Sequence, residues 1–415
     1  MAIIGGGISG LATAYMLMRT SDLRVAVLEA GLAGHGATGN NGGQAVEGTE
    51  AGFREIASIV GEERAVQGFR ELAGAMDELD RMVGKVGPPG MLAKVAGRMG
   101  IADQGLLEQR IEDLRARRAA GLDSGKVHFA DDALIGLQAE GPREPRALLA
   151  RQLWSKDQRY IAFIEMRMGL INTWDLVEKI ASHLRSEAPE RFSIYERSPA
   201  RLLRLSEEDV TIGCNGRIMV ASSAVLCTNG YLCPRIEACS PPFVKGKVKG
   251  VVGYMVGFED GSGPEGARAY FPGGKDYYYL SRKKTRTNWL TAVGGPEGSI
   301  SGEYDEGTVY HPDAYSQLGS FISSTLGLSY PPARRWQGLM GYTSTGIRIA
   351  GQDPRLPALY YNMGCNGIGI LSALAGARRL ADDMGGEDQE PSMFDPEAMA
   401  GARITMDGHE RAHRP

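Results

Sequence analysis

The chain has 415 residues, with 57 glycines and a formal net charge of −4 at pH 7. This length allows two or three domain-sized units, and the slightly acidic balance excludes a broad surface for nucleic acid or an anionic membrane. No transmembrane or signal pattern is present, and the five cysteines include no Cys-x-x-Cys pair; we therefore expect a cytoplasmic protein without a metal site or a disulfide framework.

The first thirty residues have the order of a dinucleotide-binding unit. Ala2–Ile4 predicts a short strand, residues 5–10 read Gly-x-Gly-x-x-Gly, and residues 11–20 predict a helix. A second strand is expected at residues 24–28. Glu29 follows it, 19 residues beyond the last glycine and close to the usual spacing of ~20.

Each residue type in this unit has a physical role. Gly5 permits the tight turn, Gly7 lets the backbone approach a pyrophosphate, and Gly10 allows close packing of helix and strand. Free N–H groups at the helix start favour phosphate. Glu29 would accept hydrogen bonds from ribose hydroxyls. Because no clamp for a 2′-phosphate follows it, adenosine with a free ribose is favoured over NADP.

A second glycine-rich loop comes directly after this unit, at residues 34–44. Hydroxyl and amide side chains alternate with glycines, so its backbone can lie against a flat or anionic ligand. A flexible surface loop is the alternative interpretation. Its position after the second strand favours a cofactor loop.

These two stretches resemble the N-terminal FAD-binding portion of the D-amino-acid oxidase, glycine oxidase and sarcosine oxidase superfamily. The Ala-Thr-Gly-x-Asn-Gly-Gly form at residues 37–43 is most similar to the branch that contains gamma-glutamylputrescine oxidase, although Asn40 stands where the family usually has arginine. The resemblance implies an α/β fold in which a three-layer (ββα) FAD-binding Rossmann-like domain is interleaved with a substrate domain built on a mostly antiparallel sheet.

The next hundred residues predict helices rather than chemistry. Apolar residues at helical spacing over 53–83 indicate core packing. Further on, Arg110, Arg115, Arg117 and Arg118 are spaced as a solvated helix face. Nothing in residues 91–160 specifies a site.

A capping signal at Asn172-Thr173 then opens another helix, followed by short β-like runs between residues 192 and 226. The resemblance makes this the second FAD segment, with Ala200 at the adenine and residues 227–230 closing over the nucleotide. Without the family, it is a β-meander with a polar turn.

Residues 241–332 change character, since aromatic-rich runs with alternating Val and Tyr favour a half-buried antiparallel sheet. We expect strands at 245–258, 269–271, 276–281 and 289–293, and this sheet could roof a flavin. Tyr277, Tyr278 and Tyr279 are consecutive, so neighbours face opposite ways. Plain sheet packing is the alternative for each of them.

Two motifs near the end complete the resemblance. Residues 336–343 resemble the family's Trp-x-Gly-x-x-x-x-Thr segment, and residues 364–369 match its terminal Gly-x-x-Gly-x-Gly motif. A helix predicted at 371–384 would aim backbone N–H groups at the flavin N1–C2=O edge. Beyond Met384 the polar composition predicts a frayed tail.

The resemblance implies a domain plan and a set of cofactor contacts. The FAD-binding domain would comprise residues 1–90, 171–235 and 336–384, the substrate or cap domain residues 91–170 and 236–335, and the polar tail residues 385–415. The expected contacts with FAD are Gly5, Gly7, Ile8, Ser9, Gly10, Glu29, Ala30, Ala37, Thr38, Asn41, Gly42, Gly43, Gln44, Ala200, Thr228, Asn229, Gly230, Gly364, Asn366, Gly367, Gly369 and Ile370.

Departures from the family pattern narrow the range of expected substrates. Oxidases that resemble glycine oxidase carry a carboxylate-binding arginine where this chain has Met340, and a thioether cannot replace a guanidinium fork. Simple α-amino acids are thus disfavoured unless Arg348, Arg282 or Arg335 substitutes. Met340 and residues 40–41 also occupy the regions where relatives attach flavin through cysteine or histidine, so we expect non-covalent FAD. The substrate-site candidates are Tyr278, Tyr279, Trp336, Met340 and Arg348.

By resemblance, the substrate would be an amine or amino-acid derivative that passes a hydride to flavin N5. The imine would then hydrolyse, and the flavin would be reoxidised by O2 or another acceptor. No catalytic base is assigned, since a neutral amine needs none. Two alternatives are a non-enzymatic binding protein and a tRNA-acting flavoprotein on the same fold; the acidic charge weakens the latter.

Overall fold

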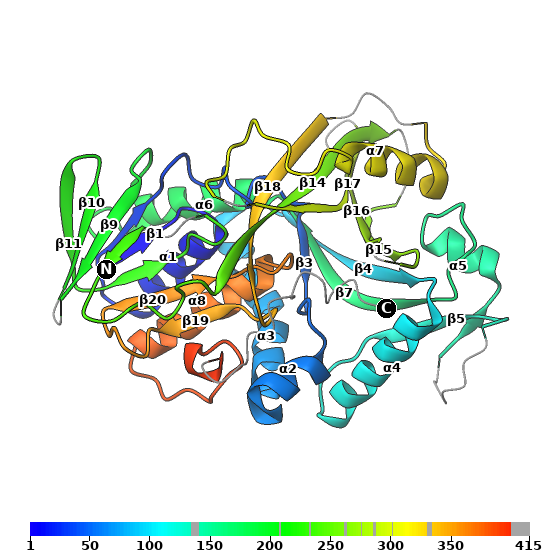
Figure 1. The fold of residues 1–415 in the computed structure, drawn as a ribbon, viewed down its shortest axis with the longest axis horizontal. Coiled ribbons are helices and arrows are strands. Elements are labelled where there is room, and N and C mark those ends of the chain that lie inside the picture. The colour runs from blue at the N-terminus through cyan, green and yellow to red at the C-terminus, as the bar shows by residue number, and fades with distance from the viewer. Residues whose placement is uncertain are drawn as a thin grey trace.

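The computed structural model describes residues 1–133, 141–206, 209–231, 234–260, 264–274, 276–284, 288–300, 302–329 and 334–399. Three sheets organise the chain. The N-terminal strand, the first helix and the last helix lie together on one side of the molecule, and the largest sheet lies on the other (Figure 1). Within these ranges, no helix is both long and apolar enough to cross a membrane.

The first sheet has six strands in the order β19-β20-β12-β1-β2-β8. Its strands are β1 (Ala2–Ile4), β2 (Val25–Leu28), β8 (Phe192–Tyr195), β12 (Ala224–Leu226), β19 (Ile349–Gln352) and β20 (Leu359–Met363). All pair in parallel except β19, which is antiparallel at the edge. Because β1 and β12 lie in the interior of the sheet, their side chains are fully buried apolar groups.

Three helices flank this sheet: α1 (Ile8–Thr20), α6 (Thr173–Glu187) and α8 (Ile370–Met384). Most side chains of α1 and α8 are buried, since the two helices pack on each other as well as on the sheet. The predicted start of α6 is confirmed, because the Asn172 side chain accepts a hydrogen bond from the Asp175 N–H at 3.2 Å.

The second sheet is a small meander formed by β9 (Ala200–Leu205), β10 (Val210–Cys214), β11 (Arg217–Ala221) and β13 (Arg235–Glu237). Its buried side chains Leu203, Val210 and Ile212 belong to the same core as the six-stranded sheet. The β-like runs predicted after α6 are therefore confirmed as strands.

The third and largest sheet has the order β18-β14-β17-β16-β15-β4-β7-β5-β6, with β3 also paired to β7. Its strands are β3 (Gln44–Val46), β4 (Leu92–Ile101), β5 (Lys126–Ala130), β6 (Arg143–Glu144), β7 (Ala162–Ile171), β14 (Val248–Asp260), β15 (Gly266–Phe271), β16 (Tyr278–Lys284), β17 (Trp289–Ser299) and β18 (Arg334–Thr343). Most neighbours are antiparallel; the β4–β15 and β5–β6 pairs are parallel.

The predicted fold class, a Rossmann-like α/β unit combined with a large, mostly antiparallel sheet, is confirmed. The predicted ends of the strands that became β14, β15 and β16 differ from the observed ends by up to three residues. The end of β17 was wrong by more, because this strand continues through Gly294 and Gly295 to Ser299. The strands β3 and β18 belong to the large sheet, although the predicted boundaries assign them to the first domain. One face of the large sheet packs on α5 (Arg146–Gln152), α7 (Ala314–Phe321) and the π-helix Ile322–Leu326.

Helices α2 (Phe53–Val60), α3 (Glu62–Val86) and α4 (Gln104–Ala119) lie together below the sheets in Figure 1. The predicted apolar stripe is thus divided between two helices at Gly61. The expectation of a solvated arginine face on α4 is wrong for two residues: the guanidinium of Arg110 lies over the Phe271 ring and that of Arg117 over the Phe69 ring, at 5.9 and 4.9 Å from the ring centroids.

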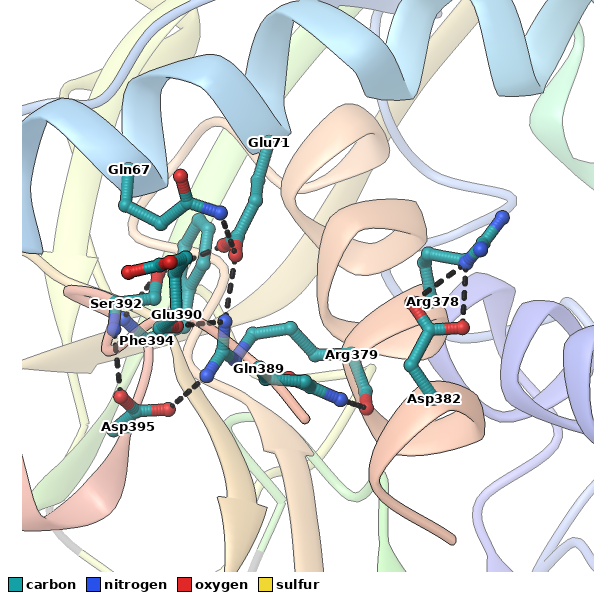
Figure 2. Close-up of polar contacts among 10 residues, drawn as sticks. All are labelled: Gln67, Glu71, Arg378, Arg379, Asp382, Gln389, Glu390, Ser392, Phe394 and Asp395. Atoms are coloured by element: carbon teal, nitrogen blue, oxygen red, sulfur yellow. Dashed lines mark hydrogen bonds and ion pairs between the residues drawn. The ribbon is translucent and has the colours of Figure 1, made fainter. Parts of the chain in front are cut away.

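The segment after α8 is docked, not frayed. Figure 2 shows Arg379 of α8 between two carboxylates, with Nη1 2.6 Å from Glu71 Oε1 on α3 and Nη2 2.6 Å from Asp395 Oδ1. Ser392 donates to the other oxygen of Glu71 at 2.7 Å, and Phe394 is fully buried. The prediction of a frayed tail is therefore wrong for residues 392–399, which end in the 3-10 turn Pro396–Met399.

Candidate cofactor and active site

A cavity of about 800 Å³ opens at the carboxyl ends of the parallel strands. Ile4, Leu28 and Cys227, which end β1 and β2 or follow β12, line its floor. Strands of the large sheet supply the opposite wall through residues such as Met255 and Met340. Ligands of open parallel sheets bind at this edge, and the volume suits a large cofactor together with a small substrate.

The first glycine turn leads directly from the sheet into the cavity. A Cβ at Gly10 would lie 1.9 Å from the Gly5 carbonyl oxygen, so only glycine allows the turn and helix α1 to close on each other. No side chain of the N-cap residue Gly7 covers the helix start. The Ile8 N–H donates to the Thr38 hydroxyl at 2.9 Å, which ties the two glycine loops together at the helix N-terminus.

Glu29 lies at the end of β2 with its carboxylate beside the turn. One oxygen accepts a hydrogen bond from the Gly6 N–H and the other from the Gly31 N–H, both at 2.7 Å. The side chain lines the cavity. A carboxylate fixed in this way can accept hydrogen bonds from a ribose without moving.

The second loop is shaped by its own amide side chains. Asn41 donates to the Thr38 carbonyl at 2.8 Å and to the Thr173 hydroxyl at 2.8 Å, and it accepts from the Gly43 N–H at 2.7 Å. Gln44 donates to the Leu280 carbonyl at 2.9 Å and so joins the loop to the large sheet. These contacts hold the loop as a shelf between the two sheets.

The C-terminal motif forms a second uncapped helix start. Asn229 accepts hydrogen bonds from the Gly364 and Cys365 N–H groups, at 3.2 and 3.0 Å. Gly367 has φ +73°, and a Cβ there would lie 2.7 Å from the Tyr342 hydroxyl oxygen. No side chain caps α8, whose N-cap residue Gly369 lines the cavity.

The N-termini of α1 and α8 therefore open into one cavity. Each presents backbone N–H groups and the positive end of a helix dipole, an arrangement that stabilises the pyrophosphate of a dinucleotide at one helix and negative charge on a reduced isoalloxazine at the other. Glu29 lines the same cavity, where its carboxylate can accept hydrogen bonds from a ribose, so the residues present fit FAD.

Comparison with known proteins agrees with this geometry. Residues 1–383 match the family described as FAD dependent oxidoreductase. The chain belongs to this family, and FAD is its cofactor. The probable oxidoreductase OrdL of Haemophilus influenzae is 32% identical over 114 residues, which are 28% of this chain and span only 25% of that protein.

Solved structures share the whole fold of the oxidoreductase. Glycine oxidase from Geobacillus kaustophilus has a TM-score of 0.70 and 16% identity, over 95% of this chain and 97% of that one. Glycine oxidase from Bacillus cereus has a TM-score of 0.71 and 15% identity, over 97% and 98% of the two chains. L-proline dehydrogenase from P. horikoshii has a TM-score of 0.67 and 15% identity, over 95% and 96%.

The structure brings most of the expected cofactor contacts to the cavity of the oxidoreductase. Gly10, Gly364 and Asn366 are the three expected contacts that do not line it. Asn366 instead accepts a hydrogen bond from the Thr343 N–H at 2.7 Å and so supports the turn from behind. The other expected contacts, from Gly5 to Ile370, all line the cavity.

The substrate-site candidates divide into two groups. Tyr279 and Met340 line the cavity. Tyr278 points to the other face of the sheet, where its ring stacks on Phe321 with centroids 4.2 Å apart, and the Trp336 ring lies against Gly257.

Arg348 is fully enclosed and does not line the cavity. It donates to Asn362 Oδ1 at 2.6 Å and to the Ser9 hydroxyl. Burial lowers its pKa to about 10.

Several cavity residues of the oxidoreductase carry no sequence motif. Met166 and Met168 on β7, Met255 on β14 and Tyr277 before β16 all contribute to the wall. The alternation of Met166 and Met168 is a signal for a common face of one strand. Nothing in the sequence indicates that this face meets the glycine loops, because the sheet pairing that brings them together is long-range.

Proposed function

We propose that this oxidoreductase oxidises the C–N bond of an amine that carries no carboxylate on the reacting carbon. FAD, when bound, accepts a hydride from that carbon at N5 and passes the electrons to O2 or another acceptor. The imine product then hydrolyses. Tyr279 and Met340 hold the substrate against the flavin position, in the part of the cavity walled by the large sheet.

The proposal is supported by the arginines on the large-sheet side of the cavity. Arg98 and Arg268 line the cavity, but Arg98 donates to Glu165 at 2.8 Å, and Arg268 donates to the Gln152 and Ala267 carbonyls at 2.8 and 2.7 Å. Arg98 Nε and both Nε and Nη1 of Arg268 are thus engaged within the protein. With these donors engaged, we infer that neither guanidinium serves as the fork for a substrate carboxylate.

The three arginines considered as substitutes for Met340 lie elsewhere. Arg348 is enclosed beneath the glycine turn, Arg282 donates to Thr291 at 3.0 Å, and Arg335 lies over the Tyr315 ring. None is among the residues that line the cavity. The methionine and tyrosine wall instead favours an amine carried on an apolar or extended chain.

The substrate class is tested with matched pairs of compounds. Benzylamine and phenylglycine differ only in the carboxylate, as do butylamine and norvaline. Each is added anaerobically to the FAD-loaded protein while the flavin absorbance is followed. We expect bleaching by an amine and little or none by its carboxylated partner; the reverse order within the pairs would overturn the proposal. Admitting air afterwards distinguishes an oxidase from a dehydrogenase.

The attachment of FAD is a second element of the proposal. Met340 and the pair Asn40-Asn41 line the cavity where relatives carry linking cysteine or histidine, and neither thioether nor amide forms such a bond. Acid precipitation should therefore leave the flavin in the supernatant. Flavin that remains with the pellet after washing would contradict non-covalent binding.

A further inference from the structure

The cavity-facing side of the large sheet carries a carboxyl group that the function described above does not use. Glu297 on β17 pairs with Gly253 on β14, and Gly253 pairs with Gly338 on β18. Paired residues of adjacent strands share a face, and Gly253 and Gly338 line the cavity. Glu297 therefore belongs to the same face as Met340, two residues beyond Gly338.

Tyr342 holds this carboxyl against the cofactor loops. It lies on the same face of β18, and its hydroxyl donates to Glu297 Oε1 at 2.9 Å. The same hydroxyl lies beside Gly367, which lines the cavity. The Tyr342 hydroxyl thus lies between Glu297 and the C-terminal glycine motif.

Tyr342 also lines a second, smaller pocket of about 230 Å³. Glu50 and Arg110 line this pocket as well. Glu50 follows β3 and Arg110 lies on α4, so both come from outside the sheet that carries Glu297. The ionisable groups Glu297, Tyr342 and Glu50 therefore extend from the large sheet to the smaller pocket.

Burial of these groups shifts their pKa values, and Glu297 exchanges its proton near neutral pH. Burial raises the pKa of Glu297 to about 7, against the Tyr342 hydrogen bond, which lowers it. Burial and the nearby Glu297 charge raise the pKa of Glu50 well above its usual value. Burial raises the pKa of Tyr277 and Tyr279, which line the cavity, and the Glu297 charge raises both pKa values further.

We propose that Glu297, positioned by Tyr342, accepts the proton that a substrate ammonium must lose before oxidation, and that Tyr342 and Glu50 then lead this proton to the smaller pocket. The inference rests on the proposed amine oxidation. In the step, an N–H bond of the substrate breaks and an O–H bond forms at the Tyr277 or Tyr279 hydroxyl, which gives its own proton to the Glu297 carboxylate. The neutral amine keeps the lone pair that expels the hydride.

The test compares Glu297→Gln with the wild type, because glutamine can still accept the Tyr342 hydrogen bond but takes no proton. With an amine that bleaches the flavin, the wild-type reduction rate should rise with pH around neutrality. In Glu297→Gln the rate at pH 7 should fall about 100-fold or more and should rise only as the free substrate amine deprotonates. Glu259→Gln, an exposed carboxyl on the neighbouring strand β14, should behave as the wild type.

A readout independent of turnover accompanies the rates. Infrared difference spectra of the FAD-loaded protein, taken across a pH titration, should show a protonated-carboxyl band that disappears near neutral pH in the wild type and in Glu259→Gln but is missing in Glu297→Gln. Tyr342→Phe removes a hydrogen bond that favours the carboxylate, so it should shift both the band and the rate profile to higher pH.

The outcomes separate the two proposals. Bleaching by an amine with an unchanged pH profile in Glu297→Gln overturns the role of Glu297 alone, as does a carboxyl band that titrates at the pH of an ordinary glutamate. If no amine bleaches the wild-type flavin, the proposed function fails, and the role of Glu297 fails with it.

Discussion

Arg348 of the oxidoreductase joins the two halves of the cofactor site: its guanidinium donates to the Ser9 hydroxyl on α1 and to Asn362 Oδ1 on β20 at 2.6 Å. A substrate-binding arginine would face the cavity, whereas this one braces the first glycine turn. We expect Arg348→Met to lower the unfolding free energy by roughly 2–4 kcal/mol and to weaken FAD binding, because buried polar partners lose their donor. Chemical unfolding and FAD titration measure both. Arg335→Met, at an exposed residue, is the control; a changed substrate preference with unchanged stability in Arg348→Met would contradict the bracing role.

Glu29 should distinguish FAD from FMN. Its fixed carboxylate is placed for ribose hydroxyls, which belong to the adenosine half of FAD. Glu29→Ala should weaken FAD binding by roughly 10- to 100-fold, the equivalent of one or two charge-assisted hydrogen bonds. Equilibrium dialysis with FAD and FMN checks this, and the affinity for FMN should stay unchanged. An equal loss for both flavins would place the effect in the turn itself, through the bonds to Gly6 and Gly31.

Met340 should control the choice between amines and amino acids. An arginine at this cavity position would present a fork to a substrate carboxylate. Met340→Arg is expected to raise kcat/KM for phenylglycine relative to benzylamine by at least about tenfold, the smallest effect of one charge-assisted pair. Met340→Leu keeps the volume without charge and should retain the amine preference. Steady-state kinetics with both compounds measure this ratio. Equal loss of both activities in Met340→Arg would point to a steric effect.

The raised pKa of Glu297 also predicts a pH-dependent stability. In the folded protein this carboxyl stays protonated up to about pH 7, whereas the unfolded chain releases the proton above its ordinary value of 4.5. The wild type therefore loses stability as the pH rises between these values, relative to Glu297→Gln. The difference in unfolding free energy should be near zero at pH 4 and reach at most about 3 kcal/mol above pH 7. Urea unfolding of both proteins at several pH values measures it; a constant difference would refute the raised pKa.

Two neighbouring arginines on α8 allow the docking of the C-terminal segment to be tested with a matched control. Arg379 bridges Glu71 and Asp395 in a largely buried setting, whereas Arg378 pairs with Asp382 one helical turn away and is more exposed. Arg379→Met should lower the unfolding free energy by about 3 kcal/mol, since it leaves buried carboxylates without a partner. Arg378→Met should cost less than about 0.5 kcal/mol. Limited proteolysis near residues 385–399 should accelerate in the Arg379 variant only.

The parts of the fold and site that could be predicted from sequence are those specified by local spacing. The turn at residues 5–10, Glu29 and the loop at 37–44 reach the cavity because short-range geometry fixes each of them. Arg348 resembles a free arginine in sequence, because its partners Ser9 and Asn362 are distant along the chain.

Long-range pairing explains the other differences. Glu297 becomes notable only through the antiparallel registers that place it beside Tyr342 and opposite Gly253. The docked end of the chain was missed for a similar reason, since Phe394 finds its burial against elements far away in sequence. The membership of the gamma-glutamylputrescine oxidase branch and the domain boundaries stay predictions.

The strand order of the six-stranded sheet determines how much of the chain must be synthesised before the cofactor can bind. β1 is made first but lies between β2 and β12, and β12 in turn needs β20, which ends at Met363. A ribosome must therefore deliver nearly the whole described chain before the two helix N-termini face each other. Until then the glycine turn has no second half, and contacts of such high sequence separation form slowly. We accordingly expect flavin to bind late, after most of the chain has been synthesised and folded.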